Sequence, residues 1–252
     1  MTDTHCHVHQ PDYQLDAEQA LERARARGVN KFVCVGTSVA DSRDAVAFAA
    51  ERDDCLASVA VHPHEAEGFG DEDKKALVEL LESGQVTAVG ECGLDYYYQH
   101  SPREAQREML RWHLEQAERY ELPVLFHIRD AFEEFWPIYD EFELPRGGVV
   151  DSFSAGVAEL EQALERNLYV ALNGIMTFTK DAHQLAAVDA LPLEKLVLET
   201  DAPFLTPVPY RGTINEPQYV CEVAQFIADR RGVTYAELES ITDANAQLLL
   251  AG

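Results

Sequence analysis

The sequence predicts an α/β protein with a single (β/α)8 TIM barrel and one extra helix at its C-terminus. Three observations lead to this prediction. Short apolar runs alternate with longer amphipathic stretches, which is the pattern of βαβ units. There are eight such runs, and the barrel has eight strands. The length of 252 residues also suits one barrel, because such domains commonly contain about 250 residues.

Each apolar run predicts one strand. The expected strands are Met1–His5, Lys31–Val35, Leu56–Val61, Val86–Glu91, Pro123–His127, Gly148–Ser152, Leu168–Asn173 and Leu196–Thr200. The amphipathic stretches between them predict helices over Asp16–Arg27, Ser42–Arg52, Asp71–Ser83, Pro102–Tyr120, Phe132–Asp140, Gly156–Arg166, Ala182–Ala190 and Gln218–Arg230, with a closing helix over Tyr235–Ile241. No repeat or composition break interrupts the pattern, so we expect residues 1–252 to form one domain.

The composition narrows the class of protein. A hydrophobic fraction of 46% can fill a sizeable core. No run of about 18 apolar residues predicts a membrane span, and the N-terminus does not resemble a signal peptide. The five cysteines are scattered without a C-x-x-C pair, which argues against a disulfide framework or a zinc–thiolate site. We therefore expect a cytoplasmic monomer with reduced thiols and no membrane partner.

The charge is strongly negative, with 45 acidic residues against 20 basic ones and a formal net charge of −25. Such a surface repels a polyanion at long range, which argues against binding long duplex DNA through basic patches. It argues less against a protein that takes a strand end into a pocket lined by cations.

Six side chains of metal-ligand type lie at or just after the ends of expected strands. They are His5, His7, Glu91, His127, Asp151 and Asp201. In a barrel these strand ends share one rim, where functional residues gather. His5 and His7 are two residues apart and therefore point to the same face. Nitrogen and oxygen donors without a thiolate predict one or two divalent cations, with Glu91 on a middle strand as the candidate bridge between two.

Further polar residues follow the third, fourth and fifth strands. His62, His64 and Arg129 suit contacts with phosphate oxygens, although a structural hydrogen bond is an equal alternative for the two histidines. Asp95 and the tyrosines Tyr96–Tyr98 lie in the expected loop after Glu91. They either contact substrate, with the rings stacking on bases, or pack over the barrel rim. The other histidines, His9, His100, His113 and His183, are expected to be solvated.

Several motifs in the chain resemble those of the TatD-like metal-dependent deoxyribonucleases. They are Asp3-Thr4-His5-Cys6-His7, Val61-His62-Pro63-His64, Gly90-Glu91-Cys92-Gly93-Leu94-Asp95-Tyr96-Tyr97, His127-Ile128-Arg129-Asp130-Ala131, Glu199-Thr200-Asp201-Ala202-Pro203 and Arg211-Gly212-Thr213-Ile214-Asn215-Glu216-Pro217. The resemblance spans nearly the whole chain. It implies a (β/α)8 fold, divalent-metal dependence and 3′-to-5′ exonuclease activity on DNA, with RNA left open as a further substrate. It also implies that His5, His7, Glu91, His127 and Asp201 are metal ligands.

One motif departs from the family. The sixth strand usually ends His-Cys-Phe-Ser-Gly, whereas here the sequence is Asp151-Ser152-Phe153-Ser154-Ala155. A carboxylate is a harder donor than imidazole, so Asp151 as a ligand favours Mg²⁺ or Mn²⁺ over Zn²⁺ at the second metal position. Alternatively, Asp151 does not reach a cation, and caps the sixth helix or binds the loop backbone.

The leading hypothesis is a phosphodiesterase with two divalent cations that removes nucleotides from DNA ends or short single-stranded DNA. Asp201 is then the candidate general base for the attacking water, and Arg129 and His64 hold the phosphate. The first alternative is a small-molecule amidohydrolase or lactonase, because the same ligands activate water against a carbonyl carbon. The second is a binding protein that lost catalysis through the change at Asp151.

Overall fold

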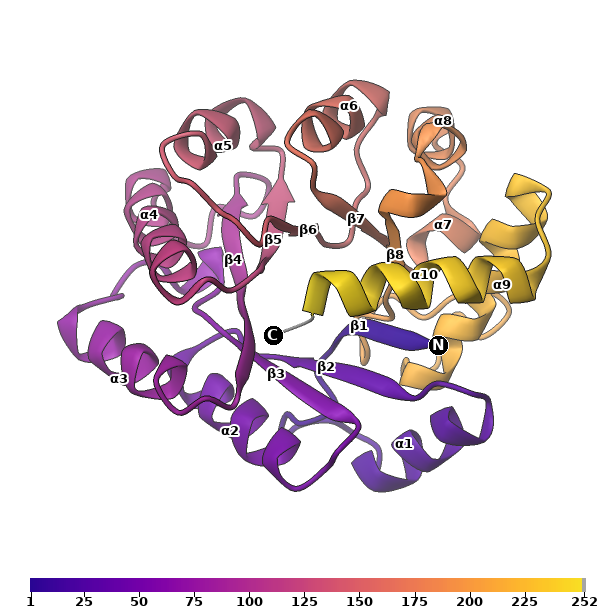
Figure 1. Cartoon of the computed structure of the whole chain (residues 1–252), viewed down its shortest axis with the longest axis horizontal. Coiled ribbons are helices and arrows are strands. Elements are labelled where there is room, and N and C mark those ends of the chain that lie inside the picture. Colours follow the sequence, from indigo (N-terminus) through magenta and orange to yellow (C-terminus); the bar gives the residue numbers. More distant parts are fainter. Residues whose placement is uncertain (251–252) are drawn as a thin grey trace. The chain divides into compact units, whose positions relative to one another are not determined.

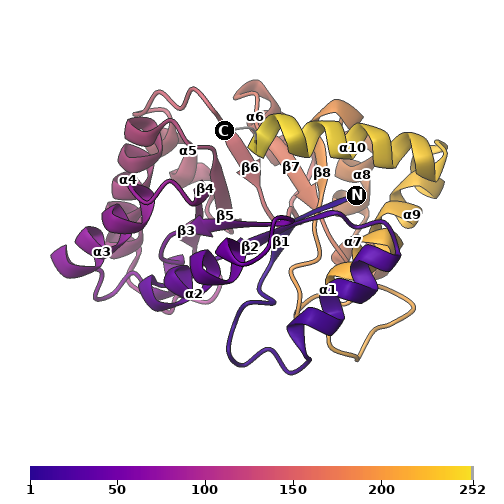
Figure 2. The same ribbon diagram turned by 60° about the horizontal axis from the view of Figure 1, so that its bottom comes forward.

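The computed structural model describes residues 1–250 (Figures 1 and 2). The chain divides into two compact units. The first unit comprises Met1–Val33 and Ser152–Leu249, and the second consists chiefly of Cys34–Asp151. Strand β2 (Lys31–Val35) begins in the first unit and ends in the second. The prediction that residues 1–252 form one domain stays a prediction.

The first unit contains three further strands, β1 (Thr2–Cys6), β7 (Tyr169–Leu172) and β8 (Leu196–Leu198). β7 and β8 pair in parallel, and a parallel bridge joins Cys6 to Ala202 just after β8. Every residue of β1 and β8 is buried, as expected for strands covered on both faces. The ends of β1 and β8 therefore lie side by side, which positions the residues that follow them.

Six α-helices belong to the described part of this unit. They are α1 (Ala17–Ala26), α6 (Val157–Glu165), α7 (Ile175–Phe178), α8 (Ala182–Ala190), α9 (Val220–Arg231) and α10 (Tyr235–Leu250). The prediction for α10 was wrong at its end, because the helix continues nine residues beyond Ile241. Its buried face includes the polar residues Thr242 and Asn245, which interrupt the apolar pattern. The Asn245 side-chain amide donates to the carbonyl oxygens of Leu193 and Leu196, both at 2.7 Å, so its burial is compensated and α10 lies against the start of β8 (Figure 2).

The second unit repeats the strand–helix alternation. Its elements are α2 (Val39–Ala50), β3 (Cys55–Val59), α3 (Asp71–Leu81), β4 (Val86–Asp95), α4 (Arg103–Tyr120), β5 (Val124–Arg129), α5 (Phe132–Tyr139) and β6 (Gly148–Val150). The strands are parallel in the order β3-β4-β5-β6. Helices α2 to α5 lie outside them (Figure 1). A short 3-10 helix, η1 (Pro63–Glu65), follows β3.

The ends of β4 and β5 differ from the prediction. Glu91 was expected to end its strand, but β4 continues to Asp95 and β5 continues to Arg129. The pairing of the two strands shifts register between Val89 and Cys92 and then resumes from Cys92–Phe126 to Asp95–Arg129. Glu91 therefore lies inside a strand at an irregularity, a feature common beside functional sites.

The fold class is confirmed: within residues 1–250, eight parallel strands alternate with helices in the order of a (β/α)8 barrel protein, and the extra C-terminal helix is present. None of the helices within residues 1–250 has the length and apolar character needed to cross a membrane. All five cysteines are buried, and none of them forms a disulfide bond within residues 1–250.

Candidate metal sites

The first cluster consists of His5, His7 and Asp201. His5 is the fourth residue of β1 and His7 follows the strand, so the two-residue period places both rings on one side. Asp201 follows β8 with φ of 56°, a left-handed conformation that aspartate tolerates better than most residues. Its backbone N–H donates to the His5 carbonyl at 2.9 Å, and the His7 N–H donates to the Ala202 carbonyl at 2.7 Å.

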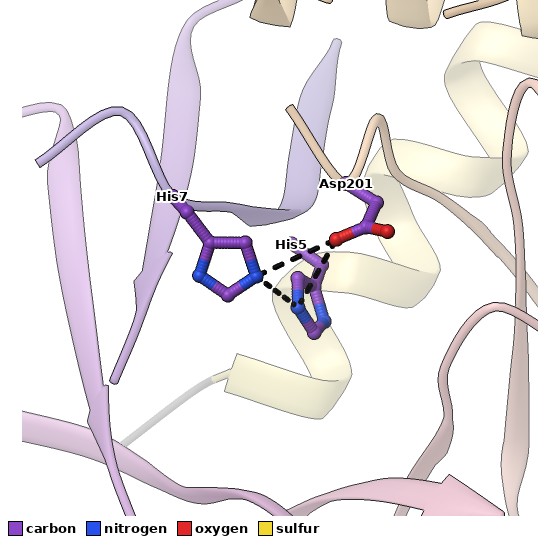
Figure 3. Close-up of side chains that lie close together, drawn as sticks. All are labelled: His5, His7 and Asp201. Carbon is purple, nitrogen blue, oxygen red and sulfur yellow. Dashed lines mark hydrogen bonds and ion pairs between the residues drawn. The ribbon is translucent and has the colours of Figure 1, made fainter. Parts of the chain in front are cut away.

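These three side chains converge on one point (Figure 3). The Nε2 atoms of His5 and His7 are 3.1 Å apart, and Oδ1 of Asp201 lies 3.9 Å and 3.4 Å from them. Ligand atoms bonded to one cation at about 2.0–2.2 Å lie about 3 Å apart. Two imidazole nitrogens and a carboxylate oxygen at these separations therefore fit a divalent cation.

Two buried carboxylates lie behind this cluster, and both were missed by the sequence analysis. Asp3 accepts hydrogen bonds from Thr200, at 2.9 Å from the backbone N–H and 2.6 Å from the hydroxyl. Glu199 accepts from the Ser152 N–H at 2.7 Å and the Asn173 amide at 3.0 Å. Burial raises the pKa of each carboxyl to about 7. Hydrogen bonds from Thr200 act to lower the pKa of Asp3, and the charge of His5 acts to lower that of Glu199, but burial outweighs both. Both groups fix the segments that carry His5 and Asp201.

The second cluster consists of His62, Glu91 and His127 from the second unit. Oε1 of Glu91 lies 2.7 Å from Nδ1 of His127 and 3.4 Å from Nε2 of His62. The three donors are close enough to bind one ion. They again comprise two imidazoles and one carboxylate, so this cluster also fits a divalent cation. The sequence had suggested His62 for substrate contact, whereas the geometry makes it a candidate ligand.

Asp95 connects this cluster to its surroundings. Its side chain is fully buried. Oδ2 lies 3.1 Å from Nε2 of His127 and 2.8 Å from Nε2 of His64, while Oδ1 accepts the backbone N–H groups of Tyr97 and Tyr98. These bonds hold the pKa of the Asp95 carboxyl well below its usual range, although burial acts to raise it. The geometry thus changes the interpretation of Asp95 from a substrate contact to a group that orients others.

Two histidines of the second cluster differ in charge. Burial lowers the pKa of His62 to about 4, helped by the neighbouring His127 and His64 and opposed by Glu91. Burial also acts to lower the pKa of His127, but hydrogen bonds to Asp95 and Glu91 outweigh it and raise the pKa to about 10. His62 is therefore a neutral ring with a lone pair for a cation. His127 lies between two carboxylates and must release the proton on Nδ1, which faces Glu91, before that nitrogen can bind a cation. Its Nε2 then still donates to Asp95, the usual arrangement for the outer nitrogen of a metal-binding histidine.

A close approach between β4 and β5 sets the position of this cluster. Gly93 is paired with His127 and has φ of 156°. A Cβ atom on Gly93 would lie 1.9 Å from the carbonyl oxygen of His127, so any side chain would push the strands apart. The glycine therefore lets Glu91 and His127 on these strands meet.

Asp151 directly follows β6 and is only 6% exposed. Its backbone N–H continues the ladder to the Phe126 carbonyl at 3.0 Å. An oxygen of its carboxylate lies within 4.8 Å of a carboxylate oxygen of Glu91, so Asp151 is near the second cluster, and its charge contributes to the raised pKa of His127. The N-cap of α6 is Gly156, so the alternative of Asp151 as that helix cap is wrong.

The prediction that the other histidines are solvated was wrong for His113 and His9, which are 1% and 8% exposed. His113 lies on α4, and its Nε2 accepts the Val61 N–H at 3.1 Å while its Nδ1 donates to the Met109 carbonyl at 2.9 Å. Burial lowers its pKa to about 4. The ring thus holds the segment that leads to His62. His100 and His183 are exposed as expected.

Comparison with known proteins agrees with this description. Residues 2–251 match the family described as TatD related DNase. An uncharacterized metal-dependent hydrolase, YabD, of Bacillus subtilis is 36% identical over 98% of this chain and 97% of its own length. A protein of Cronobacter sakazakii named 3′-5′ ssDNA/RNA exonuclease TatD is 34% identical over 99% of this chain and 97% of its own.

The fold has a near match among solved structures. YjjV of Escherichia coli, described as a TatD homologue, superposes with a TM-score of 0.94 and 29% identity over 100% of this chain and 98% of its own. The match to the family covers nearly the entire sequence, and relatives above 30% identity align from end to end. The chain therefore belongs to the TatD related DNase family of metal-dependent hydrolases.

Proposed function

We propose that this protein is a divalent-metal-dependent phosphodiesterase that removes nucleotides from the 3′ end of single-stranded DNA. The observation that carries the proposal is the pair of clusters with the same donor set, two imidazoles and one carboxylate each. Relatives at 34% identity named 3′-5′ ssDNA/RNA exonuclease support the choice of substrate.

In this proposal the first cluster holds one cation and the second cluster holds another. The cations supply Lewis-acid stabilisation of the phosphate and lower the pKa of water. The sequence-based prediction that Glu91 bridges both cations stays part of the proposal. Asp151, as an added oxygen donor, makes Mg²⁺ or Mn²⁺ the favoured metal, while the imidazoles keep Zn²⁺ as the alternative.

The chain's own groups then divide the work of hydrolysis. Asp201 has Oδ1 directed at His7 and a side chain that is 19% exposed, so Oδ2 is the candidate acceptor of the proton from the attacking water. Glu199 and Asp3 hold the segments that carry Asp201 and His5. Arg129 and His64 bind the phosphate oxygens, and Asp95 fixes the ring of His64 for that contact.

The test uses single-stranded DNA labelled at its 5′ end, with protein stripped by chelation and metal content measured. No cleavage is expected until Mg²⁺, Mn²⁺ or Zn²⁺ is returned, and labelled fragments should then shorten one nucleotide at a time. Immediate release of a labelled mononucleotide would show the opposite polarity. Full activity after exhaustive removal of metal would exclude the proposed chemistry.

The same preparation distinguishes the alternatives. Lactones report the alternative amidohydrolase or lactonase activity, which the charge of −25 modestly favours, and aryl phosphodiesters report phosphodiester cleavage in a small molecule. Turnover of lactones without cleavage of DNA would establish that alternative. Metal binding without turnover of any substrate would identify a non-catalytic protein. A cytoplasmic location and a monomeric state complete the proposal, and size-exclusion chromatography with light scattering tests the latter.

A further inference from the structure

Two exposed tyrosines and an arginine form an aromatic surface beside the second cluster. Tyr97 and Tyr98 are 57% and 50% exposed. Their rings meet edge to face, with centroids 4.8 Å apart and planes at 88°. The guanidinium carbon of Arg129 lies over both rings, 4.3 Å from the centroid of Tyr97 and 4.7 Å from that of Tyr98. We call these three residues the stacking platform.

The platform differs from the third tyrosine of the same run. Tyr96 is 5% exposed, and its hydroxyl donates to Glu134 at 3.0 Å, so this ring packs within the protein. The other two rings leave about half of their surface in water. Adjacent aromatic rings left exposed in this way are a feature of binding surfaces, because each ring has a large apolar area that a ligand can cover.

The platform is anchored to the second cluster through one carboxylate. Oδ1 of Asp95 accepts the N–H groups of Tyr97 and Tyr98 at 3.0 Å and 2.9 Å, while Oδ2 engages Nε2 of His127 at 3.1 Å. Tyr98 also contacts His64, with ring centroids 5.6 Å apart. A ligand on the platform is therefore held at a fixed position relative to a phosphate bound at the cluster.

Arg129 supplies a positive charge at this surface. Across residues 1–250 it makes no ion pair with a carboxylate, although acidic groups outnumber basic ones 45 to 20 in the sequence. Its guanidinium is instead spread over the tyrosine rings. A planar cation on aromatic rings offers a flat face to a base and N–H donors to a phosphate.

We infer that the stacking platform binds an unpaired nucleobase of the strand whose phosphate lies at the second cluster. This inference rests on the proposed function and adds a base-binding site to it. A base inside a duplex has both faces covered by its neighbours, and base pairing holds a terminal base against its partner. The platform therefore favours single-stranded or frayed ends. Stacking tolerates every base, because each has a π-face, so little sequence preference follows.

The test compares two oligonucleotides, one with a normal 3′-terminal nucleotide and one whose 3′-terminal sugar lacks a base. With the normal substrate, Tyr97→Leu should lower kcat/KM about ten-fold or more, mainly through a higher KM, and Tyr97→Phe should stay within about two-fold of wild type. With the abasic substrate, wild type and Tyr97→Leu should agree within about two-fold. Arg129→Lys keeps the charge but loses the planar face, so it should lose part of the preference for the base.

Tyr120→Leu on α4 is the matched control, because this ring contacts Glu82 and belongs to neither cluster. It should leave both substrates unchanged, and Mn²⁺ titrations should give equal metal affinity for all variants. If Tyr97→Leu lost activity equally on both substrates, or on neither, the stacking platform would be wrong. Cleavage of the normal oligonucleotide by wild type would still support the exonuclease activity. Wild type that neither cut nor bound the normal oligonucleotide would overturn both.

Discussion

His127 and Asp95 are joined through Nε2 and Oδ2 at 3.1 Å, while the opposite nitrogen of His127 faces Glu91 at 2.7 Å. The imidazole is thus fixed by a carboxylate on each side. Only the Glu91 side belongs to the second cluster, so Asp95 determines which nitrogen is presented there.

Asp95→Asn should weaken metal binding at the second cluster by about 10- to 100-fold, the usual effect of losing an outer partner of a histidine ligand. Calorimetric titration with Mn²⁺ measures this change. Asp130→Asn is the control, because Asp130 is an exposed carboxylate just after β5 and should leave the affinity unchanged. Equal affinities in both variants would show that Asp95 has no part in metal binding.

Glu91→Ala should be the most damaging change of a single ligand, with activity lowered by more than about 100-fold, beyond the effect of an outer partner. If Glu91 bridges two cations, metal analysis should find both reduced. His5→Ala leaves His7 and Asp201 in place and should keep more activity. An inactive His5→Ala beside a near-normal Glu91→Ala would rule out the bridge.

Asp151→His tests the departure from the family sequence. As a ligand, imidazole is softer than carboxylate, so relative affinity should move towards Zn²⁺ and away from Mg²⁺. Asp151→Ala should weaken one metal and leave the first cluster occupied. Competition titrations of the three proteins give the answer, and identical metal affinities would remove Asp151 from the ligands.

His113 predicts a pH-dependent loss of stability. Its pKa is about 6.5 in the unfolded chain and about 4 in the fold, so only the unfolded state binds a proton between these values. The stabilisation is complete above pH 6.5 and declines as the pH falls towards 4, by about 1 kcal/mol at pH 5.5. The free energy of unfolding, measured with urea at pH 7.5 and 5.5, should fall more in wild type than in His113→Gln. Parallel declines in the two proteins would mean that the ring titrates normally.

The alternation of strands and helices could be predicted because buried parallel strands are short apolar runs. The length of β4 could not, since Glu91 and Asp95 place carboxylates inside a strand, where the apolar pattern ends. Their burial is offset by histidine partners from η1 and β5, which sequence spacing does not reveal. The full length of α10 could not be predicted for the same reason, because the buried Asn245 donates to carbonyl oxygens that are distant in the sequence.

The candidate site was predictable where chemistry coincided with strand ends, as for His5, His7 and Asp201. His62 needed the fold, because a histidine followed by proline suits either a turn or a ligand, and only the positions of Glu91 and His127 decide between them. Asp3 and Glu199 lie within or directly after buried strands, where a carboxylate is rare unless it is hydrogen bonded.

Gly93 places a different kind of limit on this enzyme than the ligands do. Metal donors can be exchanged for one another during evolution, and Asp151 in place of the usual histidine is such an exchange if the predicted ligation holds. No other residue can replace Gly93, because even the Cβ atom of alanine would lie 1.9 Å from the carbonyl oxygen of His127. In a selection for new substrates, we therefore expect substitutions at the ligand positions but none at Gly93, which sets the spacing between β4 and β5.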